Sequence, residues 1–179
     1  NKKIFTLLVL TVAFFVRVQA QPCSLPGMTP SNAIPVCGTS VFHQDQVVNC
    51  SGPNVAQTGC PIGVTSASSF WYKFTCYQTG TLGFLISGIS STDDYDWALM
   101  DVTGHNPNDV FTNSSLAISI NLYGAGNNPS AQFPESPTGC KPGAAGNIHC
   151  EGSASGNTPF NAMPTITVGH EYLLMVTNW

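Results

Sequence analysis

The chain has 179 residues, of which only 8% are charged, with 5 Lys and Arg against 9 Asp and Glu. Nucleic-acid binding takes most of its affinity from Lys and Arg on phosphates, so this composition excludes nucleic acid as a partner. Anionic membrane surfaces are disfavoured for the same reason. Exposed helix faces are usually built from Glu, Lys and Arg, so a chain rich in uncharged polar residues and glycine favours strands.

Residues 1–20 have the three parts of a cleavable export signal. Two lysines are followed by an uncharged apolar run from Ile4 to Val16, and Ala20 stands at the expected cleavage point. A membrane span needs about 20 apolar residues, so this run is too short, and no transmembrane segment is expected after cleavage. We therefore expect a secreted or cell-surface protein that keeps Lys73 and Lys141 as its cations.

Strands are expected after an irregular, proline-rich segment at 21–36. The first is expected at 41–48. Apolar and aromatic residues then recur at every second position along 69–77 and 82–86, which indicates half-buried strands. The turn between these two runs predicts a hairpin. Further strands are expected at 95–100, 116–122, 165–168 and 172–176, the last two as a closing hairpin.

A long segment, 124–161, is rich in Gly, Asn, Pro and Ser and has no hydrophobic period. Such loops usually carry a function or leave the body of the domain. Since no stretch has a helical pattern, we expect one all-β domain over 37–179, an antiparallel β-sandwich of jelly-roll type. The chain stops at or just past a strand, so we expect this domain to be truncated and further domains of the same chain to follow.

All seven cysteines follow the expected cleavage point, in an oxidising compartment that favours disulfides. Loops of about ten residues close easily, which suggests two local pairs. A third pair follows with less support, because spacing does not determine connectivity. Cys76 is left as a buried thiol or as the partner of a cysteine beyond the chain, and no Cys-x-x-Cys spacing supports zinc. The expected disulfides are Cys50–Cys60, Cys140–Cys150 and Cys23–Cys37.

Acidic residues gather around the expected strand 95–100. Asp93, Asp94 and Asp101 are candidate ligands of calcium, which prefers several carboxylate oxygens. Asp96 is left out, because strand alternation should point it away from the core. The alternative is a solvated turn, in which Asp is also favoured, and no other cofactor is expected.

Two aromatic residues, Trp71 and Tyr77, are expected on the strand face opposite the core-facing aromatic residues. If that face is open to solvent, their rings would form a stacking platform for a sugar. The alternative is packing under a loop or across a strand pair, an ordinary stabiliser of sheets.

A hydrolase would need a catalytic set. Neither a Gly-x-Ser-x-Gly turn nor a His-Glu-x-x-His helix occurs, so no catalytic residue is assigned and no enzyme is expected. A Ser/His/Asp set could still assemble in space, because triads are defined by geometry and not by chain order.

An ordered set of segments resembles a known family. They are Phe70–Thr75, Gly80–Ile86, Asp93–Asp101 and Ile166–Val176, which are similar to strands of pre-peptidase C-terminal-like domains. More closely, a signal peptide followed by this module resembles the N-terminal region of large surface proteins of gliding bacteria, exported by the type IX secretion system. The loop 124–161 and Met100, where the family more often has an aromatic residue, depart from the pattern. The resemblance implies a β-sandwich accessory or adhesion module without catalytic residues.

We therefore expect a non-catalytic secreted module of a cell-surface protein, which mediates adhesion or accessory binding to a glycan or a surface protein. The alternative is a non-catalytic appendage of a secreted protease or glycosidase whose catalytic domain lies beyond residue 179.

Overall fold

The computed structural model of the chain describes residues 23–38, 41–45, 49–90, 93–124, 137–151 and 158–178. The expected export signal at 1–20 therefore lies outside the described residues. No helix within the described segments is long and apolar enough to span a bilayer.

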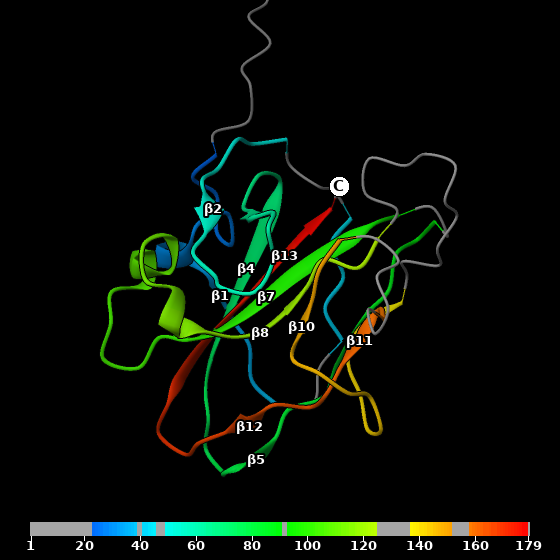
Figure 1. The fold of residues 1–179 in the computed structure, drawn as a ribbon. Helices are drawn as coiled ribbons and strands as arrows, with labels where there is room; N and C mark the ends of the chain where they lie inside the picture. The colour runs from blue at the N-terminus through cyan, green and yellow to red at the C-terminus, as the bar shows by residue number, and fades with distance from the viewer. Residues whose placement is uncertain are drawn as a thin grey trace, which may run out of the picture.

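Short strands make up most of the ordered structure, and its helices are single 3-10 turns (Figure 1). Asn106 caps the longest of these helices by accepting a hydrogen bond from the Asn108 amide, and Pro107 opens it. The helices are η1 (Pro30–Asn32), η2 (Pro107–Phe111) and η3 (Ser114–Leu116). The strands are β1 (Ile34–Pro35), β2 (Asn54–Val55), β3 (Val64–Thr65), β4 (Ser69–Thr75), β5 (Gly80–Thr81), β6 (Phe84–Ile86), β7 (Tyr95–Asp101), β8 (Ala117–Asn121), β9 (Thr138–Cys140), β10 (Ile148–His149), β11 (Phe160–Asn161), β12 (Thr165–Ile166) and β13 (Glu171–Asn178).

The strands form one large sheet and three smaller ones. The large sheet has the order β1-β4-β13-β7-β8-β10, and a three-stranded sheet has the order β11-β9-β6. β12 pairs with β5, and β2 with β3. The expected all-β domain is confirmed. Its long central strands pair antiparallel, whereas β1, β10 and β11 each pair with a neighbour in parallel.

The central strands β13 and β7 and the first half of β4 are buried on both faces, since alternate side chains enter two different hydrophobic cores. In the second half of β4, Lys73 and Thr75 are exposed. Trp71, Met100 and Met175 are fully buried in the first core. Trp97, Leu99 and Tyr172 belong to the second. In β7 and β13 the alternation therefore separates two apolar sets, whereas in the second half of β4 it separates an apolar set from a polar one.

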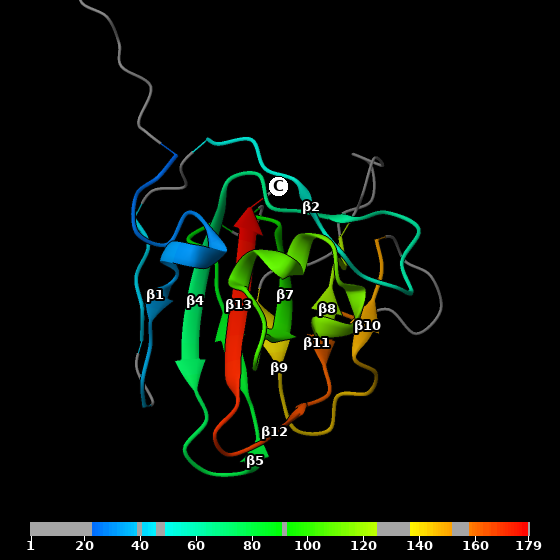
Figure 2. The same ribbon diagram turned by 90° about the vertical axis from the view of Figure 1, so that its left-hand side faces the viewer.

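Each core is closed by a different layer. The first is covered by the short helices and the β2–β3 pair, through Val55, Val64, Val110 and Leu116. The second is covered by the small sheets, through Phe84, Cys140 and Ile166 among others. Figure 2 shows the helices on the near side of the central strands and β9 and β11 behind them.

The two expected hairpins do not form. β4 pairs with β1 and β13 instead of β6, and β6 pairs with β9. β12 likewise pairs with β5, while β13 lies between β4 and β7. Segments that are adjacent in sequence thus go to different sheets, because the central strands need antiparallel partners long enough to match them. The expected first strand is also wrong for 41–45, which is not a strand, and 46–48 lies outside the described residues.

The expected loop 124–161 contributes three short strands, β9, β10 and β11, although its sequence has no period of two. Gly139 of β9 has φ +140, and a side chain there would collide with the carbonyl oxygen of Phe84 on β6. Glycine therefore permits the close approach of these two strands. Residues 125–136 and 152–157 lie outside the described part.

The expected disulfide pairing is wrong. Cys23 is bonded to Cys50, and Cys60 to Cys150, with sequence separations of 27 and 90. The Cys60–Cys150 pair forms because the fold brings the loop after β2 against the end of β10. Cys140 cannot pair with Cys150, because it points from β9 into the second core, where burial raises its pKa to about 11.

Cys76 and Cys37 are not in either disulfide. Cys76 is a buried thiol in neither bridge, as one of the two alternatives predicted. Cys37 is exposed and is not the partner of Cys23.

Removing the Cys60–Cys150 bridge should lower the free energy of unfolding more than removing the Cys23–Cys50 bridge does. Replacing both cysteines by serine should lower the free energy of unfolding by about 4–5 kcal/mol, since the bridge closes a chain of 90 residues. The same change at Cys23 and Cys50, separated by 27 residues, should cost about 3–4 kcal/mol. Urea denaturation measures both. Peptide mapping without reduction that links Cys50 to Cys60 would contradict the pairing.

Candidate functional site

The three expected calcium ligands do not converge. Asp93 and Asp94 precede β7, whereas Asp101 ends it, and a strand of this length spans ~20 Å. Asp93 accepts a hydrogen bond from the Ser90 amide at 3.0 Å, which closes a local turn. Among the described residues no three His, Cys, Asp or Glu side chains are placed to hold a metal ion. The proposed ligand set is therefore wrong as a set.

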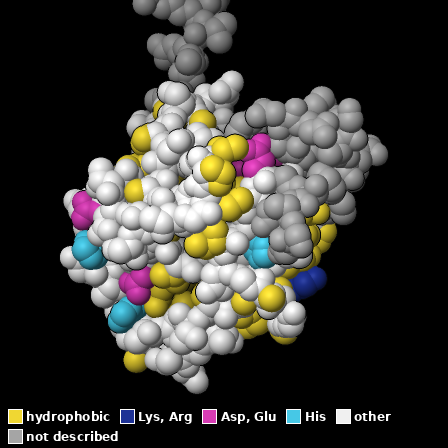
Figure 3. Space-filling view, in the orientation of Figure 1, with side chains coloured by type: hydrophobic (Ala, Val, Ile, Leu, Met, Phe, Trp, Pro, Cys, Tyr) yellow, Lys and Arg dark blue, Asp and Glu magenta, His cyan; other side chains and the backbone are white. Residues whose placement is uncertain are grey.

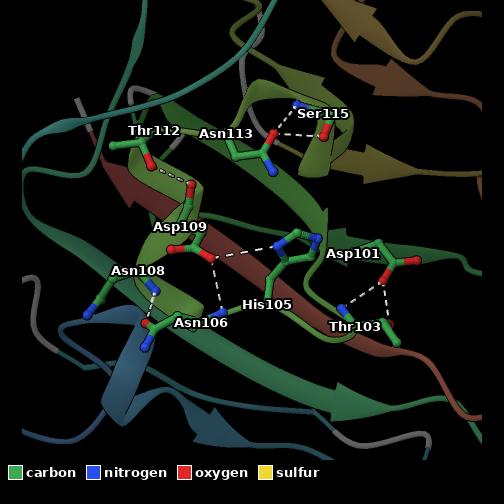
Figure 4. Close-up of polar contacts among 9 residues, drawn as sticks. All are labelled: Asp101, Thr103, His105, Asn106, Asn108, Asp109, Thr112, Asn113 and Ser115. Atoms are coloured by element: carbon green, nitrogen blue, oxygen red, sulfur yellow. Dashed lines mark hydrogen bonds and ion pairs between the residues drawn. The ribbon is translucent and has the colours of Figure 1, made fainter.

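Asp101 instead joins the end of β7 to the start of β13. Its Oδ1 accepts hydrogen bonds from the amide and the hydroxyl of Thr103, at 3.1 and 2.6 Å (Figure 4). Its Oδ2 lies 2.7 Å from Nδ1 of His170. The Thr103 hydroxyl in turn accepts from the Glu171 amide at 2.9 Å. Burial would raise the pKa of the Asp101 carboxyl, but the bonds from Thr103 and His170 outweigh it and hold the pKa below its usual value.

The loop after β7 uses its polar residues to satisfy its own backbone. Asn106 and Asp109 together cap the N-terminus of η2: the Asn106 side chain accepts from the Asn108 amide at 2.9 Å, and Asp109 Oδ2 accepts from the Asn106 amide at 3.1 Å. Asn113 accepts from both the amide and the hydroxyl of Ser115 (Figure 4). His105 lies 3.6 Å from Asp109 at the edge of this loop. These hydrogen bonds stabilise the conformation of the loop, and the side chains that make them are not grouped around a shared binding site.

A small cavity of about 30 Å³ lies at the opposite end of β7. Asp94, Asp96 and Glu151 line one side of it, and Ile62 and Leu122 line another. Asp96 lies on the face of β7 opposite Trp97, as alternation predicted, but this face is covered too, so the side chain is 8% exposed. Glu151 reaches the site from a distant segment, which no local spacing in the sequence could have indicated.

Of the two residues of the expected sugar platform, Trp71 is buried and Tyr77 is exposed. Trp71 is 0% exposed and packs edge-on against Phe111 of η2, at 5.8 Å between ring centres. It belongs to the first core, so the platform with Tyr77 is wrong. Trp71 follows the alternative of packing under a covering element, because η2 covers this part of the second face of β4.

Tyr77 is 85% exposed at the end of the molecule beyond β4. Val168, 55% exposed, lies beside it, because the Gly169 amide donates to the Cys76 carbonyl and the Val168 amide donates to the Thr79 hydroxyl. We call this surface the Tyr77–Val168 tip. Two backbone segments hold it in a fixed conformation.

A buried polar network, which the sequence analysis did not predict, anchors β9, β10 and β11 to β8. Asn161 is fully buried, and its amide nitrogen lies 2.9 Å from the Ser119 hydroxyl and from the carbonyls of Ile120 and Asn147. Its oxygen accepts from Asn121 at 2.6 Å. Buried Asn and Ser in a chain full of exposed Asn and Ser carry no distinguishing sequence signal.

Comparison with known protein families, with characterised proteins and with solved structures finds no match for this chain.

Asn161→Ala should destabilise the protein by about 2–4 kcal/mol, because it leaves several buried polar partners without a hydrogen bond. Asn54→Ala, at an exposed position on β2, is the control and should change the free energy of unfolding by less than about 0.5 kcal/mol. Urea denaturation measures both. Equal stability of the two variants would contradict a structural role for the network.

Asp101→Asn should make the free energy of unfolding fall less steeply as the pH is lowered. Because the folded-state pKa of Asp101 is lowered, its stabilising contribution is present above its unfolded pKa of about 3.9 and is lost as the pH falls through the folded value. The drop in unfolding free energy between pH 5 and pH 2 should therefore be smaller in the variant, by less than about 1 kcal/mol, since the carboxyl is partly exposed. The charge-matched control is Asp45→Asn. An unchanged drop would contradict the Asp101–His170 contact.

Proposed function

We propose that this chain is a non-catalytic module of a secreted cell-surface protein and that it binds a glycan or a surface protein through the Tyr77–Val168 tip. The single observation that carries the proposal is the exposed Tyr77 ring, which is held on a rigid end of the β-sandwich. The resemblance to accessory modules of gliding-bacterial surface proteins, noted in the sequence, supports the same proposal.

The disulfides support secretion. Two bridges join remote parts of the chain, and such bridges persist in oxidising compartments and are rare in the cytosol. They also stabilise a domain that must remain folded without help outside the cell.

The chemistry around the tip suits an uncharged ligand. Tyrosine offers an apolar ring with a hydroxyl at its end, which favours it in recognition surfaces. On the face shown in Figure 3, acidic, histidine and lysine side chains lie scattered, and most of the remaining described surface is backbone, uncharged polar side chains and hydrophobic side chains. Exposed threonines lie on the two chain segments that contain the tip, and their hydroxyls can exchange hydrogen bonds with sugar hydroxyls. They are Thr75, Thr79, Thr81, Thr165 and Thr167.

Binding should depend on the Tyr77 ring. The protein is applied to a glycan array and to intact cell-surface preparations, and the dissociation constant is measured for whatever retains it. Tyr77→Ala should weaken binding ~10-fold or more, as expected for the loss of a central aromatic contact. Tyr77→Trp should retain binding, because it keeps a ring in the same place.

Ile89→Ala is the matched control, because Ile89 is 94% exposed and lies on another loop. It should bind like the parent protein. The proposal fails if neither glycans nor surface preparations retain the protein, or if Tyr77→Ala binds as tightly as the parent. Turnover of a retained polymer by the parent protein would contradict the non-catalytic assignment.

A further inference from the structure

The two larger sheets end in four edge strands, β1 and β10 in the large sheet and β11 and β6 in the small one. An edge strand presents unpaired N–H and C=O groups, which can pair with a strand of another molecule. Natural β proteins block such edges with proline, charge, bulges or a covering loop. The four edges of this protein differ in whether such a device is present.

Two edges are blocked by their own sequence. In β1 the Val36 amide bonds to the Lys73 carbonyl on β4, so Pro35 presents its backbone outward, where it has no N–H to offer. In β11 the hydroxyl of Thr158 satisfies the outward backbone of Phe160. It donates to the Phe160 carbonyl at 2.7 Å and accepts from its amide at 3.4 Å.

The β10 edge is covered by a loop. The carbonyls of Asn147 and His149 accept hydrogen bonds from β8, so Ile148 directs its backbone outward. The loop at Gly59 lies against the Ile148 side chain, since a Cβ on Gly59 would be 3.2 Å from it. The Cys60–Cys150 bridge holds this loop in place.

β6 has no comparable device among the described residues. Along β9, successive residues direct their backbone groups to opposite sides. The amides of Gly139 and Lys141 donate to the carbonyls of Pro159 and Asn161, on the β11 side. Thr138 and Cys140 therefore direct their backbone groups to the other side, where β6 lies. Their partners on β6 are Ile86 and Phe84. Leu85 therefore directs its N–H and C=O to the open side of the sheet.

The sequence around β6 adds no protection. By the same alternation the open side also receives the backbone of Gly83 and Ser87, and both residues are exposed. Leu85 is 64% exposed. Residues 79–90 contain no charged residue and no proline, which are the usual blocking devices.

We propose that β6 is a self-association edge, which pairs antiparallel with β6 of a second copy of this chain. The twofold axis passes through Leu85, so that Leu85 stands opposite its own copy and Gly83 stands opposite Ser87. Such an isologous contact requires a self-complementary surface. β6 meets that requirement, because its open backbone groups are symmetric about Leu85 and the Leu85 side chains meet on one face.

Charge permits a second copy at this edge. The chain is acidic, with a formal net charge of −4, so two copies repel each other where their carboxylates approach. Residues 79–90 carry no charge, and the carboxylate that follows them, Asp93, accepts a hydrogen bond from the Ser90 amide. Because β6 is short, the dimer is weak and depends on protein concentration. This inference is independent of the Tyr77–Val168 tip.

Sedimentation velocity of the purified protein across a wide concentration range should show a monomer–dimer equilibrium. Leu85→Lys should raise the dimer dissociation constant ~10-fold or more, because two lysines would stand opposite each other. Ile148→Lys, at an exposed position on the blocked β10 edge, should leave the dissociation constant unchanged. A monomer at every concentration, or a dimer that survives Leu85→Lys, would overturn the proposal.

A cross-link tests the register. Directly opposed residues of a hydrogen-bonded antiparallel pair have Cα atoms about 5.5 Å apart, within the range of a disulfide. In a Cys37→Ser background, Leu85→Cys should therefore form a covalent dimer on mild oxidation, whereas Ile148→Cys should not. Equal cross-linking of the two variants would overturn the register. A Leu85→Cys cross-link to a different protein would identify a foreign strand as the occupant and would overturn self-pairing.

Discussion

The burial of β13, β7 and the first half of β4 on both faces is the constraint on which the other parts of the structure depend. A strand with one open face needs a single covering layer, but these three need two. β13 pairs with both β4 and β7 over nearly its whole length, so the three strands form one rigid slab. Every other element is either a neighbour of this slab in the large sheet or a cover on one of its faces.

The covering layers are built from segments with little apolar sequence of their own, so they are attached by other means. On one side, 3-10 helices capped by Asn and Asp place Val110 and Leu116 over Trp71 and Met100. On the other side, the buried hydrogen bonds of Asn161 hold β9, β10 and β11 against β8. The Cys60–Cys150 bridge then joins a loop of the first side to the end of β10.

This construction places the recognition features at the margins of the slab. The Tyr77–Val168 tip extends past the end of β4, where no layer covers it, and the Asp101–His170 contact braces the neighbouring turn. The β6 edge belongs to a covering sheet whose opposite edge is closed by Thr158. In the part of the chain that the structure describes, these open surfaces are thus an end and an edge, while both faces of β7 and β13 are closed.

The sequence by itself determined the fold class and the positions of the long strands. Alternation at 69–77 and 95–100 is a local property of the chain, and it survives folding as β4 and β7. Local signals also identified Cys76 as a candidate buried thiol and Tyr77 as a candidate exposed ring.

Only the tertiary structure decided which strands pair, which cysteines bond and which faces are covered. These choices depend on groups far apart in sequence, and local spacing carries no information about them. For Trp71 the sequence left open both a solvent-facing platform and packing under a cover, because alternation gives two faces without saying how many of them a layer will cover. The same limit explains Asp96, whose burial follows from segments that meet only in the folded chain, and Cys60, whose partner lies 90 residues away.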